Sequence, residues 1–305
     1  KRMHILILGG TKFVGRHIVE QALLRGHEIT ILQRGQTNKE LFAETKKFYG
    51  DRIAIQNILP DKNWDAVIDT CGYHPEDVKR SAEYLKGRCH HYIFISTISV
   101  YADFSKSGIN EKSSLSHLNV PLPERDLPIA AETYGPLKAL CEEQVLKYFP
   151  DKSSLLIRPG IIAGAHDPTH RFDYWINAFL SGKNIRAPDD DQAPFSVLDV
   201  RALAQWAIDS AEKRRYGIYN LVGPKKPITL KEFLLLTAKI IPSAPIDWIS
   251  LEQITEGEFP LYYPREYWGA FQICAHKAYD DSLADISLEE TIRSVVKFLQ
   301  QKSCN

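Results

Sequence analysis

The stretch from Ile5 to Arg34, written with one flanking residue at each end, reads HILILGGTKFVGRHIVEQALLRGHEITILQRG (residues 4–35). It begins with a continuous apolar run, residues 5–8, that is short enough for a β-strand buried on both faces. A glycine-rich turn follows, and apolar residues then recur at helical spacing over residues 14–23. Residues 29–32 read as a second strand. The sequence therefore predicts a strand–helix–strand unit of about 30 residues.

The turn in this unit has the spacing of a dinucleotide-binding fingerprint, with one departure. Gly9 permits a tight turn, Gly15 lets the helix pack closely on the strand, and the helix amino terminus offers N–H groups to a pyrophosphate. The middle glycine of a G-x-x-G-x-x-G spacing is replaced by Lys12, which adds a cation beside the turn. The alternative is an ordinary glycine-rich turn in a flavodoxin-like sheet. We expect the turn to bind a cofactor through Gly9, Gly10, Thr11, Lys12, Phe13, Val14 and Gly15.

The second strand ends in Gln33 and Arg34. An acid at this place binds the ribose 2′-hydroxyl of NAD, whereas an arginine suits the 2′-phosphate of NADP. Gln33 has no charge that would repel a phosphate, and Arg34, with Lys12, forms a paired cation site for it. We therefore expect NADP, with NAD as the second choice. In the alternative interpretation Arg34 is a solvated surface residue.

The bulk composition excludes several classes of protein. The chain has 305 residues, enough for one large α/β domain or a domain with a lobe. It carries 38 basic and 38 acidic residues, and this zero net charge gives no indication of a nucleic acid or an anionic membrane as a partner. The five cysteines are an odd number with no C-x-x-C spacing, which indicates reduced thiols in the cytoplasm. No apolar run approaches the roughly 18 residues of a membrane span.

The alternation of strands and helices continues beyond the first unit and predicts a Rossmann-type, doubly wound parallel sheet. Asp51 follows the third expected strand and would face an adenine, or else pair with Arg52. Cys71, Gly72 and Tyr73 lie at the carboxyl end of the fourth strand, where ligands bind in open α/β sheets. We expect further strands at residues 47–50, 64–72, 90–99 and 154–160, and helices at residues 39–45, 75–85 and 132–149.

The regular alternation of expected strands and helices ends near residue 165. The following part is rich in loops and prolines, although a helix and a strand of the main fold are expected at 197–211 and 217–222. We assign residues 1–164 plus about 196–222 to the dinucleotide-binding domain. Residues 165–195 plus 223–305 are assigned to a smaller, mostly C-terminal substrate lobe, with short and terminal helices at 174–180 and 288–299.

Tyr134 and Lys138 are four residues apart, so they share one face of the helix predicted there. The fifth strand ends with several hydroxyl residues, among them Thr97. A tyrosine near an ammonium group is a usable acid or base, because the positive charge lowers the pKa of the phenol. Tyr148 and Lys152 have the same spacing, but a proline interrupts this pair and no strand-end hydroxyls accompany it.

With these motifs the chain resembles the extended branch of the short-chain dehydrogenase/reductase superfamily, in particular its epimerase/dehydratase-like proteins. The resemblance covers residues 3–222 well and the lobe weakly. The motifs that carry it are GGTKFVG (9–15), STISVYAD (96–103), YGPLK (134–138) and RPGIIAG (158–164).

The resemblance implies a role for each residue of the site. Tyr134 exchanges a proton with a substrate hydroxyl or carbonyl, and Thr97 hydrogen-bonds the same oxygen. Lys138 holds the nicotinamide ribose and tunes Tyr134, while C4 of the nicotinamide gives or takes the hydride. The resemblance adds Arg158 and Pro159 to the cofactor contacts, and Tyr73, Tyr101 and Arg171 to the substrate contacts. Arg171 can equally pair with Asp167 or Asp173.

Two departures shape the expected function. Ile98 and Ser99 stand where sugar-nucleotide 4,6-dehydratases have an Asp-Glu pair, which argues against that elimination. The turn that contains Lys12, GGTKF, resembles that of atypical family members, which include plant chloroplast RNA-binding proteins with a G-G-T-R-F turn. We expect an NAD(P)-dependent oxidoreductase or epimerase acting on a small substrate, such as a sugar or nucleotide sugar. The alternatives are an RNA-binding or cofactor-sensing regulatory protein and a scaffold without turnover.

Two further features concern metals and assembly. His166 and His170 have the spacing of a helical metal pair, but Pro168 lies between them and no third ligand is evident, so we assign no metal. Members of the resembled family often dimerise through the helices that correspond to residues 75–85 and 132–149. A homodimer is therefore a hypothesis.

Overall fold

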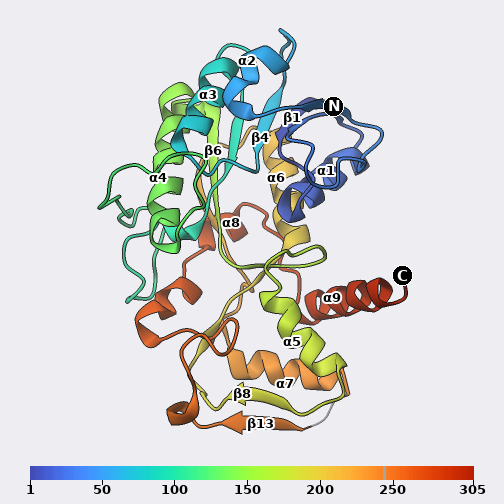
Figure 1. The fold of residues 1–305 in the computed structure, drawn as a ribbon, viewed down its shortest axis with the longest axis vertical. Helices are drawn as coiled ribbons and strands as arrows, with labels where there is room; N and C mark the ends of the chain where they lie inside the picture. Colours follow the sequence, from blue (N-terminus) through green and yellow to red (C-terminus); the bar gives the residue numbers. More distant parts are fainter. Residues whose placement is uncertain (243–244) are drawn as a thin grey trace. The chain divides into compact units, whose positions relative to one another are not determined.

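The first strand–helix–strand unit forms as the sequence predicts, and its two strands pair in parallel in the sheet of unit 1 (Figure 1). The computed structural model describes residues 1–242 and 245–305. The chain divides into two units. Unit 1 comprises residues 1–102, 111–159 and 203–221, and unit 2 comprises residues 103–110, 160–202 and 222–305. The division expected from the sequence placed residues 103–110, 160–164, about 196–202 and 222 in the first domain, whereas the structure has them in unit 2.

Unit 1 contains a seven-stranded, all-parallel sheet with the order β11-β6-β5-β4-β1-β2-β3. This order confirms the doubly wound fold, and its switch point lies between β1 and β4. Ligands bind at the carboxyl ends of the strands beside such a switch point. The strands are β1 (His4–Leu8), β2 (Glu28–Gln33), β3 (Lys46–Tyr49), β4 (Ala66–Asp69), β5 (Tyr92–Ile95), β6 (Ser154–Pro159) and β11 (Gly217–Leu221).

Helices cover both faces of this sheet (Figure 1). Helices α3 (Pro75–Leu85) and α4 (Ala131–Tyr148) pack against each other on one face. Helices α1 (Phe13–Leu24) and α6 (Val200–Lys213) lie on the other face. Short helical turns complete the unit: η1 (Arg52–Ala54), α2 (Ile55–Ile58), η2 (Ile98–Val100) and η3 (Asp151–Ser153).

The short helix expected at residues 39–45 does not form, and this prediction is wrong. The segment consists of turns, and Asn38 and Phe42 adopt positive φ angles of 47° and 63°. The backbone N–H and the hydroxyl of Thr45 both bond to the carbonyl oxygen of Phe42. The segment has no apolar stripe whose burial would favour a helix over these local turns.

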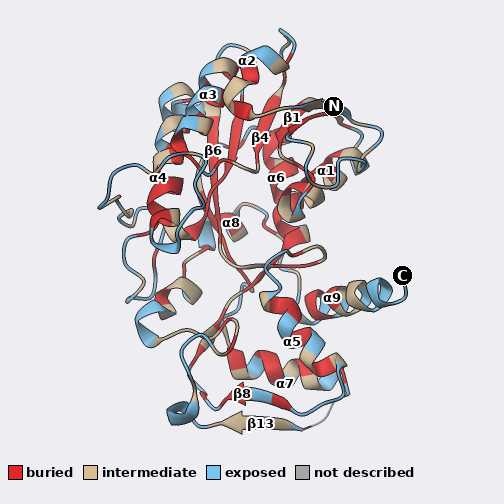
Figure 2. Cartoon of the chain, viewed as in Figure 1, coloured by how far each residue is buried: buried red, intermediate tan, exposed pale blue. Residues whose placement is uncertain are grey.

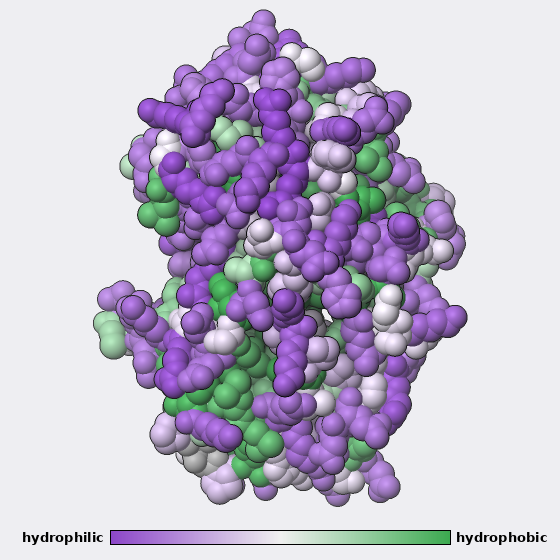
Figure 3. Space-filling model, turned by 180° about the vertical axis from the view of Figure 1, so that it is seen from behind, coloured by the Kyte–Doolittle hydropathy of each residue, from purple (hydrophilic) through white to green (hydrophobic). Residues whose placement is uncertain are grey.

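Unit 2 is built around its own core, which is rich in aromatic rings. Phe195 and Phe233, for example, stack with ring centroids 4.3 Å apart. Where this core reaches the surface, hydrophobic side chains gather on one face, as the green area in Figure 3 shows. The elements are β7 (Ile162–Ala163), α5 (Arg171–Leu180), β8 (Ile185–Pro188), β9 (Pro194–Phe195), β10 (Leu198–Asp199), β12 (Ile228–Thr229), α7 (Leu230–Ile240), β13 (Ile246–Ile249), η4 (Leu251–Gln253), η5 (Arg265–Phe271), α8 (His276–Asp280) and α9 (Leu288–Ser303). In the described part of the chain, no helix has the length and apolar character to cross a membrane.

The strands of unit 1 are buried almost throughout (Figure 2), yet an ion pair lies among them. Arg52 donates to both carboxylate oxygens of Asp69 at the end of β4, over 2.7 and 2.6 Å. Tyr92 on β5 donates to the same carboxylate over 2.6 Å, and Ser81 on α3 contacts the guanidinium. Burial acts to raise the pKa of Asp69, but the charge and hydrogen bonds of Arg52 outweigh it and lower this pKa. The pair thus joins η1, α3, β4 and β5.

We predict that Asp69→Asn destabilises unit 1 by about 3–5 kcal/mol, because it leaves the buried charge of Arg52 without its partner. The measurement is urea denaturation at pH 7. Since the pKa of Asp69 is lowered by folding, its contribution is complete above the unfolded value of about 3.9 and is lost as the pH falls through the lower folded value. The deficit of the variant should therefore shrink at strongly acid pH.

The control is Asp61→Asn, which removes an equally charged side chain that is 89% exposed and paired with Arg88. We expect it to change the unfolding free energy by less than about 1 kcal/mol. Equal stabilities of the two variants would contradict the assignment.

Candidate active site

The glycine-rich turn after β1 has no room for side chains. Gly9 and Gly10 adopt φ angles of 95° and 94°, a region that favours glycine. A Cβ atom on Gly9 would lie 2.4 Å from the hydroxyl of Thr70, and one on Gly15 would lie 2.9 Å from the backbone of Gly10. The turn and the first turn of α1 therefore pack directly on each other. A tight turn at the amino end of a helix is the setting in which backbone N–H groups bind a phosphate group.

Lys12 is the N-cap residue of α1 and is exposed, with an extended backbone and no side-chain cap. Its backbone therefore directly precedes the first N–H groups of the helix. The neighbouring Thr11 is buried and donates to the side chain of Gln33, while Asn38 donates to the carbonyl oxygen of Thr11. Phe13 and Val14, which begin the helix, are half-buried. These contacts connect the turn to the end of β2.

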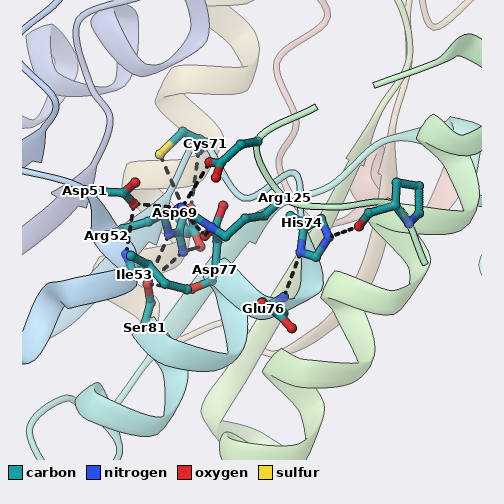
Figure 4. Close-up of polar contacts among 12 residues, drawn as sticks. Asp51, Arg52, Ile53, Asp69, Cys71, His74, Glu76, Asp77, Ser81 and Arg125 are labelled. Atoms are coloured by element: carbon teal, nitrogen blue, oxygen red, sulfur yellow. Dashed lines mark hydrogen bonds and ion pairs between the residues drawn. The ribbon is translucent and has the colours of Figure 1, made fainter. Parts of the chain in front are cut away.

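At the end of β2, Arg34 is exposed and Gln33 is buried. Burial acts to raise the pKa of the Asp51 carboxyl after β3, but hydrogen bonds from Arg125 and Ile53, together with the charges of Arg125 and Arg34, lower it. The alternative in which Asp51 pairs with Arg52 is wrong, because Arg52 binds Asp69 instead. The carboxylate of Asp51 accepts hydrogen bonds from the backbone N–H of Ile53 and from Arg125 (Figure 4).

Lys138 holds the segment after β4 in place through a hydrogen bond to the backbone of Gly72. The ammonium of Lys138 donates to the carbonyl oxygens of Gly72 and Ile95, each over 2.8 Å. Lys138 is buried, and burial lowers the pKa of its ammonium. Burial also raises the pKa of the Cys71 thiol, despite the opposing charge of Arg52, so this thiol is protonated at neutral pH. Tyr73 is half-exposed, and its ring centroid lies 5.0 Å from the Lys138 ammonium.

The structure brings Thr97, Tyr134 and Lys138 together, because α4 packs against η2 at the end of β5. The hydroxyl oxygen of Thr97 accepts a hydrogen bond from the N–H of Ser99 over 3.0 Å. The hydroxyl proton of Thr97 therefore points elsewhere and can be donated to a ligand. Tyr134 lies in the first turn of α4 and is half-buried.

Gly135 permits this packing. A Cβ atom at residue 135 would lie 2.0 Å from the carbonyl oxygen of Ser99, so only glycine fits here. Sequence reasoning did not single out Gly135. The signal that could have found it is a glycine inside a predicted helix, where it costs about 1 kcal/mol relative to alanine and needs a packing reason.

A second buried network was also missed, and it contains two of the predicted residues. Glu142, one helical turn beyond Lys138, accepts from Arg158 at 2.9 and 2.6 Å and from Ser96 at 2.5 Å. Arg158 also donates to the hydroxyl of Tyr101, which in turn donates to Asn220. The structure thus places Arg158 and Tyr101 inside unit 1, although the sequence assigned them to cofactor and substrate. The repeated four-residue spacing from Tyr134 to Glu142 was the available signal.

The remaining predicted residues lie apart from this cluster. Pro159 ends β6 and is buried beside β11. Arg171 begins α5 in unit 2, where its N–H groups contact the hydroxyl of Thr169 rather than Asp167 or Asp173. His170 approaches Asp173, and the ring of His166 packs edge-on against Phe298. No group of three or more potential metal ligands occurs among the residues that the structure describes.

Comparisons with known proteins show similarity at the level of family and fold. Residues 5–221 match the family described as the NAD dependent epimerase/dehydratase family. UDP-arabinose 4-epimerase 1 of Arabidopsis thaliana is 24% identical over 282 residues, which cover 76% of this chain and 65% of the relative. The chloroplast stem-loop binding protein of 41 kDa b of the same plant is 24% identical over 239 residues, covering 72% and 59%. The chain spans less than two thirds of the length of the curated relatives it matches.

Among solved structures, dTDP-glucose 4,6-dehydratase of Bacillus anthracis, crystallised with NAD, superposes with a TM-score of 0.73. It is 16% identical and the match covers 98% of this chain and 97% of that chain. At this identity the likeness shows the fold.

We predict that Gly135→Ala destabilises the protein by about 1–3 kcal/mol, because the added methyl group must push α4 away from the Ser99 carbonyl. Urea denaturation measures the loss. Glu143→Ala introduces the same residue at an exposed position of the same helix and should stay within about 0.5 kcal/mol of the wild type. If both variants were equally stable, the close packing of α4 on η2 would be refuted.

Proposed function

Since the chain belongs to the NAD-dependent epimerase/dehydratase family, we propose that it is an epimerase-type enzyme that reversibly oxidises a hydroxyl-bearing carbon of a nucleotide sugar. The observation that carries the proposal is the placement of Thr97, Tyr134 and Lys138 at the end of β5, in the unit that holds the glycine-rich turn. The relatives that are named as UDP-sugar epimerases support the substrate class.

The residues present fit a nicotinamide dinucleotide. The turn requires glycine at Gly9, Gly10 and Gly15, because a Cβ atom at any of the three would meet neighbouring atoms within 3 Å. A pyrophosphate binds in such a place through the N–H groups of α1 and the charge of Lys12. Asp51, Cys71 and Gly72 lie along the same carboxyl edge of the sheet and complete the proposed site.

Each catalytic residue performs one task. A dinucleotide bound at this edge supplies or removes the hydride. Tyr134 takes the proton of a substrate hydroxyl and returns it to the carbonyl oxygen, and the hydroxyl of Thr97 donates to the same oxygen. The buried charge of Lys138 favours the phenolate of Tyr134. Tyr73, half-exposed beside Lys138, and Arg171 remain proposed substrate contacts.

We predict that Tyr134→Phe lowers the interconversion of UDP-sugar C4 epimers by about 10²–10⁴-fold, because it removes the acid and base, while dinucleotide binding persists. Turnover of UDP-glucose and UDP-arabinose by the wild type is measured by chromatography, and binding by calorimetry. Tyr148→Phe alters the other tyrosine with a lysine four residues on and should leave turnover unchanged. Full activity of Tyr134→Phe would overturn the mechanism.

We also propose that Arg34 gives a preference for NADP over NAD. Arg34→Ala should reduce the affinity for NADPH about tenfold or more and leave that for NADH unchanged, because a guanidinium forms charge-assisted hydrogen bonds with a 2′-phosphate. Fluorescence titration with both nucleotides measures this. Lys39→Ala removes a nearby exposed cation as a control. Equal binding of NADH and NADPH by the wild type would show that Arg34 is a surface residue.

Nucleic-acid binding is the second candidate, and the match to the chloroplast stem-loop binding protein favours it. The formal net charge of zero argues against it, since nucleic-acid-binding surfaces are strongly basic. Tight binding of a stem-loop RNA that weakens steeply with salt would support this candidate.

A homodimer through α3 and α4 also remains a proposal, for which Leu146, 42% exposed on α4, offers an apolar contact.

A further inference from the structure

The connection between η2 and α4 contains a segment that hardly touches the rest of unit 1. From residue 117 to residue 132, every residue is exposed except Leu118, Pro123 and Arg125, which are half-buried. Even apolar side chains such as Leu122 and Leu127 are about half in solvent, at 48% and 56% exposure. Hydrophobic burial therefore does not hold this segment in place.

Two polar contacts hold it instead, and Figure 4 shows both. His74, the N-cap residue of α3, accepts the N–H of Glu76 on one ring nitrogen, so its other nitrogen donates to the carbonyl oxygen of Pro123 over 2.8 Å. Two residues later, Arg125 reaches back to the body of unit 1. It bonds Asp77 in the first turn of α3 at 2.9 and 2.7 Å and Asp51 at 2.7 Å.

The contact between Arg125 and Asp51 lies at the edge of the sheet where the proposed cofactor site is. Asp51 lies just beyond β3, at the carboxyl edge of the sheet that also carries the glycine-rich turn. Its Oδ1 atom accepts from both Ile53 and Arg125. A carboxylate has two oxygens and about four acceptor positions. Oδ2 of Asp51 can therefore accept a hydrogen bond from the amino group of an adenine while Arg125 stays bonded to Oδ1. The arginine and a bound adenine are therefore compatible.

We propose that Arg125 is a further residue of the dinucleotide site, which fastens residues 121–126 as a strap beside Asp51 and slows the release of the bound cofactor. This inference rests on the proposed function, because it takes the edge at Asp51 as the adenine end of that site. The strap is held by ion pairs near the surface, whose attraction is screened within about 10 Å at 0.1 M salt. The strap should therefore loosen as the salt concentration rises.

The test is the dissociation rate of the dinucleotide from the full chain, measured by stopped-flow displacement with whichever of NADH and NADPH binds the wild type. We expect Arg125→Ala to raise this rate about three- to tenfold at low salt, which corresponds to the modest strength of such pairs. The association rate should change little. The wild-type rate should approach that of the variant at 1 M salt, because screening opens the strap in both.

Three further measurements make the test decisive. Arg125→Lys keeps the charge but not the planar fork that bonds two carboxylates, and should release the cofactor at an intermediate rate. Arg88→Ala removes an arginine that is paired with Asp61 elsewhere on the surface and should release it at the wild-type rate. Hydrogen exchange of residues 118–130 should slow on cofactor binding in the wild type and not in Arg125→Ala.

The outcomes separate the two proposals. If the wild type binds a dinucleotide and Arg125→Ala releases it at the wild-type rate, the strap inference is overturned and the proposed function stands. If the wild type binds neither NADH nor NADPH, the proposed function fails, and the inference that depends on it fails too.

Discussion

A buried ion pair between Arg52 and Asp69 is the contact on which the carboxyl edge of the sheet depends. Its two charges lie among apolar strands, where an unpaired charge would be very unfavourable. The chain must therefore bring η1, β4, β5 and α3 to the same point before the pair is complete. Because Cys71 and Gly72 lie two and three residues after Asp69, the same pair also determines where the proposed ligand-binding segment begins.

A second arginine and carboxylate organise the other half of this edge in the same way. Arg158 and Glu142 join β6 to α4, and Ser96, the residue before Thr97, donates a hydrogen bond to Glu142. Neither pair is needed to make the sheet, since apolar residues of similar volume could fill the same space. Both fix the direction of strand ends and helices, which the catalytic geometry requires and apolar packing alone specifies less strictly.

The sequence was sufficient for the architecture and for the proposed catalytic residues, because these follow from local patterns. The apolar run before Gly9, the helix that follows and the four-residue spacing of Tyr134 and Lys138 are all local. Contacts between distant residues have no such signal. Arg125 is 74 residues from Asp51, and the partner of Arg158 could not be identified without knowing how β6 and α4 meet. Arg52 is adjacent to Asp51 in the sequence, yet the hydrogen-bonded partner of Asp51 is Arg125.

The contacts of α4 lie on a single stripe, and this constrains how the helix can change in length. Gly135 abuts the Ser99 carbonyl, Lys138 bonds two strand ends, and Glu142 meets Arg158. Each residue added to a helix rotates everything beyond it by about 100°. One insertion or deletion between Gly135 and Glu142 would therefore turn the buried carboxylate away from its arginine, whereas an insertion beyond Glu142 would alter only the last turns. Changes of length in this helix are thus tolerated only toward its carboxyl end.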